Sequence, residues 1–324
     1  MQNTPKEWQV LKNIRNKVQR HNPNTIVPLG DDAFVFKNFP GYSVIAQDMM
    51  VEDVHFRLDY SCAFDLGHKA LAVNLSDLAA MGADPRFAQV SLAIPKEITE
   101  TWLDEFYQGM TTLADKFGVE IAGGDLCVSP RGVIIDVSVH GSCDKPITRH
   151  GTQAGDILLS SGPLGLSTTG LRALNEDRTG DFPGATARHL RPLPRLDLLP
   201  QLRQHADKIH ALMDCSDGLV NDALILSKKP YGNGHSPHIG GVHLFPDQFP
   251  LHDETLRMAH LSKAYEYALW GGEDYELLIS VNPEDRTLFP EWTEVGQFTE
   301  SPGVFLIHGD GKEEISTFKG WKHF

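Results

Sequence analysis

The chain has 324 residues, 41% of them hydrophobic and 22% charged, which is ordinary for a globular protein of one large or two medium domains. Its 43 acidic and 29 basic residues give a net charge of −14, which argues against a nucleic-acid or anionic-membrane partner. The four cysteines are far apart and form no CxxC pair, so they indicate neither a zinc site nor a disulfide framework.

The first half of the chain alternates between strand and helix patterns. At the N-terminus, Trp8, Leu11, Ile14 and Val18 recur at helical spacing, without the uninterrupted apolar core of a signal peptide. No apolar run is long enough to span a membrane, so we expect a cytoplasmic protein. Hydrophobic periodicity predicts strands at 32–36, 43–48, 87–95 and 132–142 and helices at 65–82 and about 98–117.

A Pro- and Gly-containing stretch at 144–156 separates this half from a second one, and we expect domains at 1–146 and 147–324. In the second half a strand in DILLSSG leads through a glycine-rich turn into a helix that opens at about Gly165. Residues 228–241 have the composition of a surface loop. The remaining predicted elements are helices near 195–206, from about 217 and at 254–268, and strands at 211–216, after 238 and at 275–281. The fold class is therefore mixed α/β.

Aspartates recur where these elements end, usually beside glycine. They are Asp31 and Asp32 before a strand, Asp48 and Asp125 at strand ends, Asp77 in an apolar helical run, and Asp214 and Asp217 at a strand-to-helix turn. Six of them, Asp31 excepted, would converge in one cleft if these edges lie on one side of the fold. Converging carboxylates repel unless cations hold them, and hard oxygen ligands suit Mg²⁺ carrying substrate phosphates. Any one of them alone is equally well explained as a cap, a turn residue or a paired core aspartate.

Candidate phosphate ligands accompany these acids. The segment SSGPLGLST, residues 160–168, would bring backbone N–H groups to a helix N-terminus, where an anion is favoured. No Walker loop is present. Arg149, in the predicted interdomain loop, is either a phosphate ligand or a solvated arginine. Glu273 and Asp274 in GGEDYELL precede a strand, where they form a turn or face a ligand.

Seven segments, taken in chain order, resemble the thiamine-monophosphate kinase family. They are GDDAF, MMVEDVHF, HKALAVNLSDLAAMGADP, IAGGD, MDCSDGL, GGEDYELL and KGWKHF, and the match runs from about residue 28 to the last residue. NLSDLAAMGADP points to the superfamily shared with aminoimidazole ribonucleotide synthetase and selenophosphate synthetase. GGEDYEL and the GWxHF-like ending narrow the resemblance to the kinase.

The resemblance implies ATP-dependent transfer of the γ-phosphoryl group to thiamine monophosphate, giving thiamine diphosphate, with several Mg²⁺ ions. It implies a two-domain fold like that of aminoimidazole ribonucleotide synthetase. In that fold the N-terminal domain binds ATP and magnesium, and its strands form a barrel across a homodimer. The C-terminal α/β domain closes the active site.

The resemblance also implies roles for individual residues. The implied magnesium ligands are Asp32, Gln47, Asp48, Asp77, Asp125, Asp214 and Asp217. The implied ATP contacts are Gly124, Asp125, Arg149 and Ser216, and the implied contacts to thiamine monophosphate are His55, Glu273 and Trp321. Catalysis would rest on Asp32, Asp77, Asp214 and Arg149. Without the resemblance, Trp321 would be a core tryptophan and His55 an ordinary strand-end histidine.

Departures from the family pattern leave alternatives open. Gln47 precedes Asp48 where the family usually has a hydroxyl residue, and Leu126 follows Asp125 where it usually has threonine, so both changes remove oxygen donors. Asp53 stands where glycine is common. One alternative is a sensor that binds nucleotide or thiamine phosphates without turnover. The other is a different ATP-using enzyme of the superfamily, which GGEDYELL and the lack of an N-terminal cysteine disfavour.

Overall fold

A computed structural model describes residues 6–18, 22–29, 33–227, 240–309, 311–315 and 319, without the side chains of 6–9 and 312–314. The chain divides into two compact units. The first unit is Met1–Leu78 with Ala83–Pro146, and the second is Ala79–Gly82 with Ile147–Phe324. Both units combine helices with a sheet, so the predicted mixed α/β class is confirmed. Among the described residues, no helix has the length and apolar character needed to cross a bilayer.

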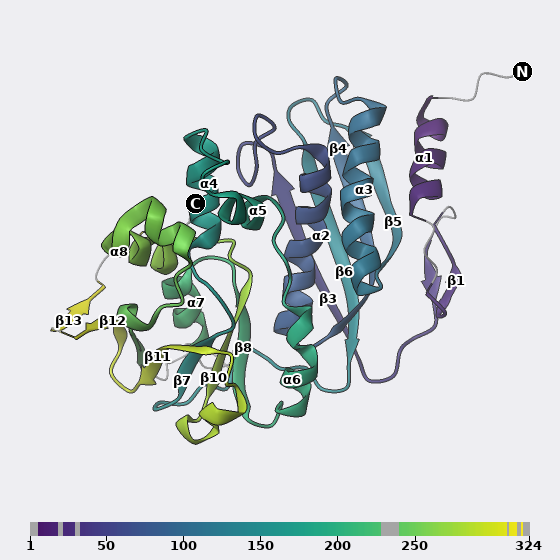
Figure 1. Ribbon diagram of the computed structural model, residues 1–324. Coiled ribbons are helices and arrows are strands. Elements are labelled where there is room, and N and C mark those ends of the chain that lie inside the picture. The colour runs from purple at the N-terminus through teal and green to yellow at the C-terminus, as the bar shows by residue number, and fades with distance from the viewer. Residues whose placement is uncertain are drawn as a thin grey trace, which may run out of the picture. The chain divides into compact units, whose positions relative to one another are not determined.

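The first unit is built on a four-stranded sheet in the order β3-β6-β4-β5. Strand β3 (Tyr42–Val51) is antiparallel to β6 (Ile134–Cys143), β6 is antiparallel to β4 (Asp84–Ile94), and β4 is parallel to β5 (Glu120–Val128). Helices α2 (Ala63–Ala80) and α3 (Glu100–Phe117) lie side by side over one face of this sheet (Figure 1). The remaining elements are α1 (Lys6–Lys17), β1 (Thr25–Val27) and β2 (Val35–Phe36).

Glycines allow α2 and α3 to pack in backbone contact. A Cβ atom on Gly67 of α2 would lie 1.8 Å from the carbonyl oxygen of Phe106, and one on Gly109 of α3 would lie 1.9 Å from that of Phe64. The side chains of Leu71, Leu75 and Leu78 on α2 are fully buried, since the helix has the sheet on one side and α3 on another. Packing against the sheet on one side and α3 on another explains why the α2 sequence is apolar nearly all round.

The second unit is built on a seven-stranded sheet in the order β13-β12-β9-β11-β7-β10-β8. Its strands are β7 (Ile157–Ser160), β8 (Ile209–Cys215), β9 (Gly241–Leu244), β10 (Glu276–Val281), β11 (Thr293–Thr299), β12 (Gly303–His308) and β13 (Gly311–Glu314). Its α-helices are α4 (Leu166–Asn175), α5 (Pro183–Leu190), α6 (Leu199–Gln204), α7 (Leu219–Leu226) and α8 (Asp253–Trp270). Short 3₁₀ turns occupy Leu196–Leu198, Pro246–Gln248 and Pro283–Leu288.

Strand β10 lies between β7 and β8 and is antiparallel to both. The last residues of β7 and β8 therefore share one edge of the sheet with the first residue of β10. The helix predicted to open near Gly165 is confirmed, because α4 begins at Leu166 directly after the glycine-rich turn. Four elements of this unit, α5 and β11 to β13, were not among the predicted ones.

Candidate active site

In the first unit, Asp48 and Asp77 lie on elements that a buried asparagine connects. The main-chain N–H of Asp48 in β3 donates to Oδ1 of Asn74 in α2 at 2.9 Å, and Nδ2 of Asn74 donates to the carbonyl oxygen of Ala70 at 2.9 Å. Asn74 is fully buried, whereas Asp48 is exposed and Asp77 is partly exposed. The strand that carries one predicted ligand is thus fixed to the helix that carries the other, and both carboxylates reach the surface.

Gln47 makes a different set of contacts from its neighbour Asp48. Its Nε2 donates to both carboxylate oxygens of Asp136 in β6, at 2.8 and 3.1 Å. Successive residues of a strand project from opposite faces of the sheet, so this amide points away from the face of the Asp48 side chain. That geometry argues against the Gln47 side chain and the Asp48 carboxylate sharing one ion.

The predicted ATP-binding segment lies on β5, where the chain requires a glycine. Gly124 has φ of +150°, and a Cβ atom there would lie 1.8 Å from the carbonyl oxygen of Val90 in β4. Asp125 follows in an exposed position, paired with Ser91 of β4. Leu126 pairs with Leu92, so the position where the family usually has threonine carries an apolar side chain opposite another one.

In the second unit, the three motifs SSGPLGLST, MDCSDGL and GGEDYELL meet at the edge formed by β7, β8 and β10. The main-chain N–H of Glu273 donates to the carbonyl oxygen of Ser216 at 2.8 Å, and that of Tyr275 donates to Cys215 at 2.9 Å. Asp274 accepts the N–H groups of Gly165 at 2.5 Å and Ser167 at 2.9 Å. Segments more than 100 residues apart in the chain therefore form one hydrogen-bonded structure.

Burial sets the protonation of Asp274 within this structure. The side chain is fully buried, and the resulting desolvation raises the pKa of its carboxyl from an ordinary value of 3.8 to about 7. The N–H groups of Ser167 and Gly165 act in the opposite direction, because they stabilise the carboxylate. Asp274 therefore has a structural role, since it joins GGEDYELL to the turn before α4, while its neighbour Glu273 remains partly exposed.

The β8–α7 turn carries three carboxylates. Asp214, the residue before the last one of β8, is buried, and Asp217 is exposed in the turn. Asp222 on α7 is fully buried and accepts the main-chain N–H of Asp217 at 3.2 Å. Burial, followed by the negative charges of Asp214 and Asp217, raises the pKa of Asp222 well above its ordinary value. The raised pKa favours the protonated form of Asp222, and Asp214 and Asp217 are the acidic neighbours that contribute to it.

A buried ion-pair cluster lies beside the same edge. Glu276, the first residue of β10, pairs with Arg188 of α5 and with Arg195. Its carboxylate also accepts the Ser161 hydroxyl at 2.6 Å, and Arg195 donates to the Ser161 carbonyl oxygen at 3.0 Å. Arg149 is exposed, next to Thr148, whose carbonyl oxygen accepts the N–H of Leu212 in β8.

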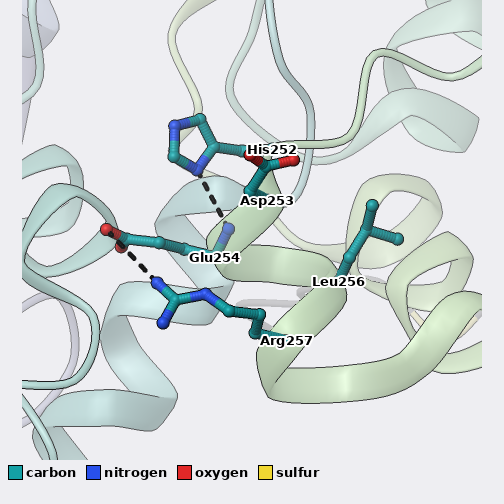
Figure 2. Close-up of a pocket in the computed structure, with 5 residues that line it drawn as sticks. All are labelled: His252, Asp253, Glu254, Leu256 and Arg257. Carbon is teal, nitrogen blue, oxygen red and sulfur yellow. Dashed lines mark hydrogen bonds and ion pairs between the residues drawn. The ribbon is translucent and has the colours of Figure 1, made fainter.

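Three predicted residues, Asp31, Asp32 and Trp321, lie outside the described residues, as does the predicted loop from 228 to 239. Within the described ranges, no group of three or more His, Cys, Asp or Glu side chains is arranged to hold a metal ion. A cavity of about 620 Å³ lies elsewhere in the second unit, at the start of α8. His252, Asp253, Glu254, Leu256 and Arg257 line it (Figure 2), and none of them is a predicted site residue.

Comparison with known proteins settles the family. The family model for the AIR synthase related protein, N-terminal domain, matches residues 30–143. The thiamine-monophosphate kinase of Aquifex aeolicus is 33% identical over 302 residues, which cover 91% of this chain and 92% of that protein. The chain belongs to the thiamine-monophosphate kinase family. The crystal structure of the Stenotrophomonas maltophilia kinase has a TM-score of 0.79 at 29% identity, over 93% of this chain and 96% of that one. The structure of AaThiL complexed with AMPPCP and TMP has a TM-score of 0.77 at 29% identity, over 98% and 97%.

The turn after β3 explains one departure from the usual sequence of the thiamine-monophosphate kinase family. Asp53, which stands where glycine is common, has φ of +65°, a conformation that glycine adopts without strain and aspartate tolerates. In the same turn, Nδ1 of His55 accepts the N–H of Val51 at 3.0 Å. This contact fixes the His55 ring, with Nδ1 as the acceptor.

Several residues that contact the predicted site residues or their neighbours were missed in the sequence. They are Asp136, His189, Arg188, Arg195, Asp222 and Glu276. Asp136 is a carboxylate within the largely buried strand β6, and this is a signal that could have been used. Glu276 is the first residue of β10 and lies within GGEDYELL, so the motif itself could have pointed to it. The other four lie on short helices or in loops, where a charged or polar residue is indistinguishable from a solvated one until the tertiary structure is known.

Proposed function

We propose that this chain transfers the γ-phosphoryl group of ATP to thiamine monophosphate, producing thiamine diphosphate and ADP. The observation that carries the proposal is the near full-length similarity to thiamine-monophosphate kinases. The hydrogen bonds that join SSGPLGLST, MDCSDGL and GGEDYELL support it, because two motifs that resemble the kinase family, MDCSDGL and GGEDYELL, then lie together in the fold. We place the reaction in the cytoplasm, and the four free thiols are compatible with a reducing compartment.

We assign Mg²⁺ binding to two sets of aspartates, one in each unit. The first set is Asp48, Asp77 and Asp125, with Asp32 as a further candidate, and the second is Asp214 and Asp217. The Gln47 side chain is left out of the first set because its amide contacts Asp136. The donor chemistry fits, since all are oxygen ligands, and Asp214 and Asp217 place two carboxyl groups close together at the β8–α7 turn. Mg²⁺ usually takes one or two carboxylates and completes its coordination with phosphates and waters, so a preassembled cage is not required. When bound, the ion neutralises charge on the transferring phosphoryl group.

The chain's own residues then have positioning roles. Gly124, Arg149 and Ser216, with Asp125, are the proposed contacts to ATP. The acceptor is a phosphate oxygen that is already nucleophilic, so in-line positioning and charge neutralisation matter more than proton abstraction. Arg149 supplies positive charge for the phosphates, and Asp32, Asp77 and Asp214 complete the proposed catalytic set.

The thiamine half of the acceptor requires other contacts. His55, Glu273 and Trp321 are the proposed ones. The Glu273 carboxylate complements the positive charge of a thiazolium ring, and Trp321 offers it a cation–π surface worth about 0.5 to 2 kcal/mol.

The active form proposed is a homodimer in which the first-unit sheets of two copies form a barrel. Helices α2 and α3 cover one face of this sheet (Figure 1), and on β3 the side chains of Ile45 and Met49, which project from the same face as each other, are more than half exposed. A second copy would bury them. Sedimentation should give the mass of a dimer for the purified chain and a monomer for a Met49→Lys, Ile45→Lys variant.

The activity is tested with purified protein, ATP, thiamine monophosphate and Mg²⁺, separating the thiamine phosphates by chromatography. Formation of thiamine diphosphate that stops on chelation of Mg²⁺ is expected. Calorimetric binding of ATP without any product after overnight incubation would instead identify a sensor. ATP consumption with unchanged thiamine monophosphate would point to another acceptor.

A further inference from the structure

The loop from Gly271 to Tyr275 has a backbone that needs external support. Glu273 and Tyr275 have φ of +65° and +51°, in the left-handed region that costs a residue other than glycine about 1 kcal/mol or more. Gly272 leaves no room for a side chain, since its Cβ atom would lie 2.4 Å from the carbonyl oxygen of Ser216. Such conformations persist where the surroundings hold them, and they concentrate at functional sites.

The main chain of this loop is held by the bonds to Cys215 and Ser216 and by the Asp274 carboxyl. None of these contacts fixes the direction of the Glu273 side chain. The Glu273 side chain contacts His189 of α5. Nδ1 of His189 lies 3.4 Å from Glu273 Oε2 and 3.0 Å from the Ser167 hydroxyl oxygen. A carboxylate only accepts hydrogen bonds, so the Glu273 contact is favourable with the hydrogen on Nδ1, where it also faces the nearer Ser167 hydroxyl oxygen.

The two partners differ in exposure. His189 is 3% exposed, whereas the Glu273 side chain is 28% exposed. Glu273 therefore has one end against a buried ring and still reaches the surface, where a ligand can contact it. The imidazole is too deeply buried to serve as the ligand contact itself.

Helix α5, which carries His189, is fixed at both ends. At its start, the Glu254 carboxylate accepts the N–H groups of Gly184 at 3.1 Å and Ala185 at 2.7 Å. Glu254 belongs to the first turn of α8 and appears in Figure 2. At the other end, Arg188 pairs with buried Glu276. The position of the His189 ring is therefore set by the fold before any ligand binds.

We propose that His189 is a positioning residue that holds the Glu273 carboxylate toward the thiamine moiety of the acceptor. It sets the affinity for thiamine monophosphate and leaves ATP binding and phosphoryl transfer to other residues. This inference rests on the proposed function, in which Glu273 contacts thiamine monophosphate.

The test uses His189→Leu, His189→Asn, Glu273→Gln and the double variant His189→Leu, Glu273→Gln in the full chain. His189→Leu should raise KM for thiamine monophosphate about tenfold, with KM for ATP and kcat changed less than about twofold. His189→Asn keeps a donor near the Nδ1 position and should stay within about threefold of the wild type. In the Glu273→Gln background, His189→Leu should add almost nothing, because the carboxylate it positions is already gone.

A matched control is His210, which contacts Asp156 at 2.8 Å at the opposite edge of the same sheet. His210→Leu should lower thermal stability and leave both KM values unchanged. Equal increases in the two KM values of His189→Leu, or effects of His189 and Glu273 that multiply in the double variant, would reduce His189 to a structural residue.

Calorimetric titration with thiamine monophosphate alone separates the two hypotheses. If the wild type binds thiamine monophosphate but forms no product, the proposed function fails. The role of His189 is still decided by comparing the Kd values for thiamine monophosphate. A Kd about tenfold weaker in His189→Leu than in the wild type supports it, and equal Kd values overturn it. Absence of both binding and product with the wild type overturns both. Should His189→Leu not fold, His189→Ala in the wild-type and Glu273→Gln backgrounds gives the same comparison.

Discussion

The raised pKa of Asp274 predicts a measurable pH dependence of folding stability. The folded pKa of about 7 lies above the ordinary value of 3.8, so the folded chain binds a proton that the unfolded chain has released. The stabilisation is complete below about pH 4 and is lost as the pH rises through about 7. Each pKa unit corresponds to about 1.4 kcal/mol, so the contribution of Asp274 should fall by about 2.5 kcal/mol between about pH 5 and about pH 8.

Urea unfolding of the wild type and Asp274→Asn across this pH range measures the effect. Asparagine does not titrate and places an NH₂ group against one of the two N–H donors, so the variant should be less stable, most of all at low pH. The difference between the two proteins should shrink by about 2.5 kcal/mol toward about pH 8. Asp253→Asn, at an exposed position, controls for loss of a charge. If the difference in free energy of unfolding between the wild type and Asp274→Asn is constant with pH, the pKa of Asp274 is not raised in the folded chain.

Three further predictions concern other positions. Glu276→Gln should lower the free energy of unfolding by about 3 kcal/mol, because two largely buried arginines lose the carboxylate between them; thermal unfolding that matches the wild type would contradict this. Gly124→Ala should cost about 2 kcal/mol and weaken calorimetric ATP binding, since the new Cβ meets the Val90 carbonyl oxygen. Asp77→Asn should raise the Mg²⁺ concentration for half-maximal rate about tenfold and change stability by less than about 0.5 kcal/mol; an unchanged Mg²⁺ dependence would remove Asp77 from the site.

Elements with strong local patterns could be predicted from the sequence. The apolar run of α2 and the glycine-rich turn before α4 each determine structure through nearby residues, and both are found as expected. Strand β11 was missed because its register shifts between Glu294 and Gly296, and such a bulge interrupts the alternation that identifies a strand.

The missed helix α5 has another cause. It has only eight residues, without an apolar stripe, and its first N–H groups are capped by Glu254, about 70 residues away in the chain. No local window contains that information. The same holds for His189 on this helix, which becomes a buried partner of Glu273 only through tertiary contacts.

At the site, the motif residues could be found in the sequence. Which of them are buried and which reach the surface could not be predicted. Glu273 and Asp274 were equivalent in the sequence, as a turn or as ligand contacts. In the structure Asp274 is buried between two N–H donors, and Glu273 reaches the surface. Likewise Gln47 was grouped with Asp48, yet its amide contacts Asp136 across the strand pair. These assignments depend on which face each residue occupies and on distant partners.

The central claim is that this chain phosphorylates thiamine monophosphate with ATP. The most direct measurement supplies ATP labelled with ¹⁸O in its γ-phosphoryl group and examines the thiamine phosphates by mass spectrometry. The expected product is thiamine diphosphate with the label in its terminal phosphoryl group, formed one for one with ADP. Label recovered only in inorganic phosphate, with thiamine monophosphate unchanged, would contradict it.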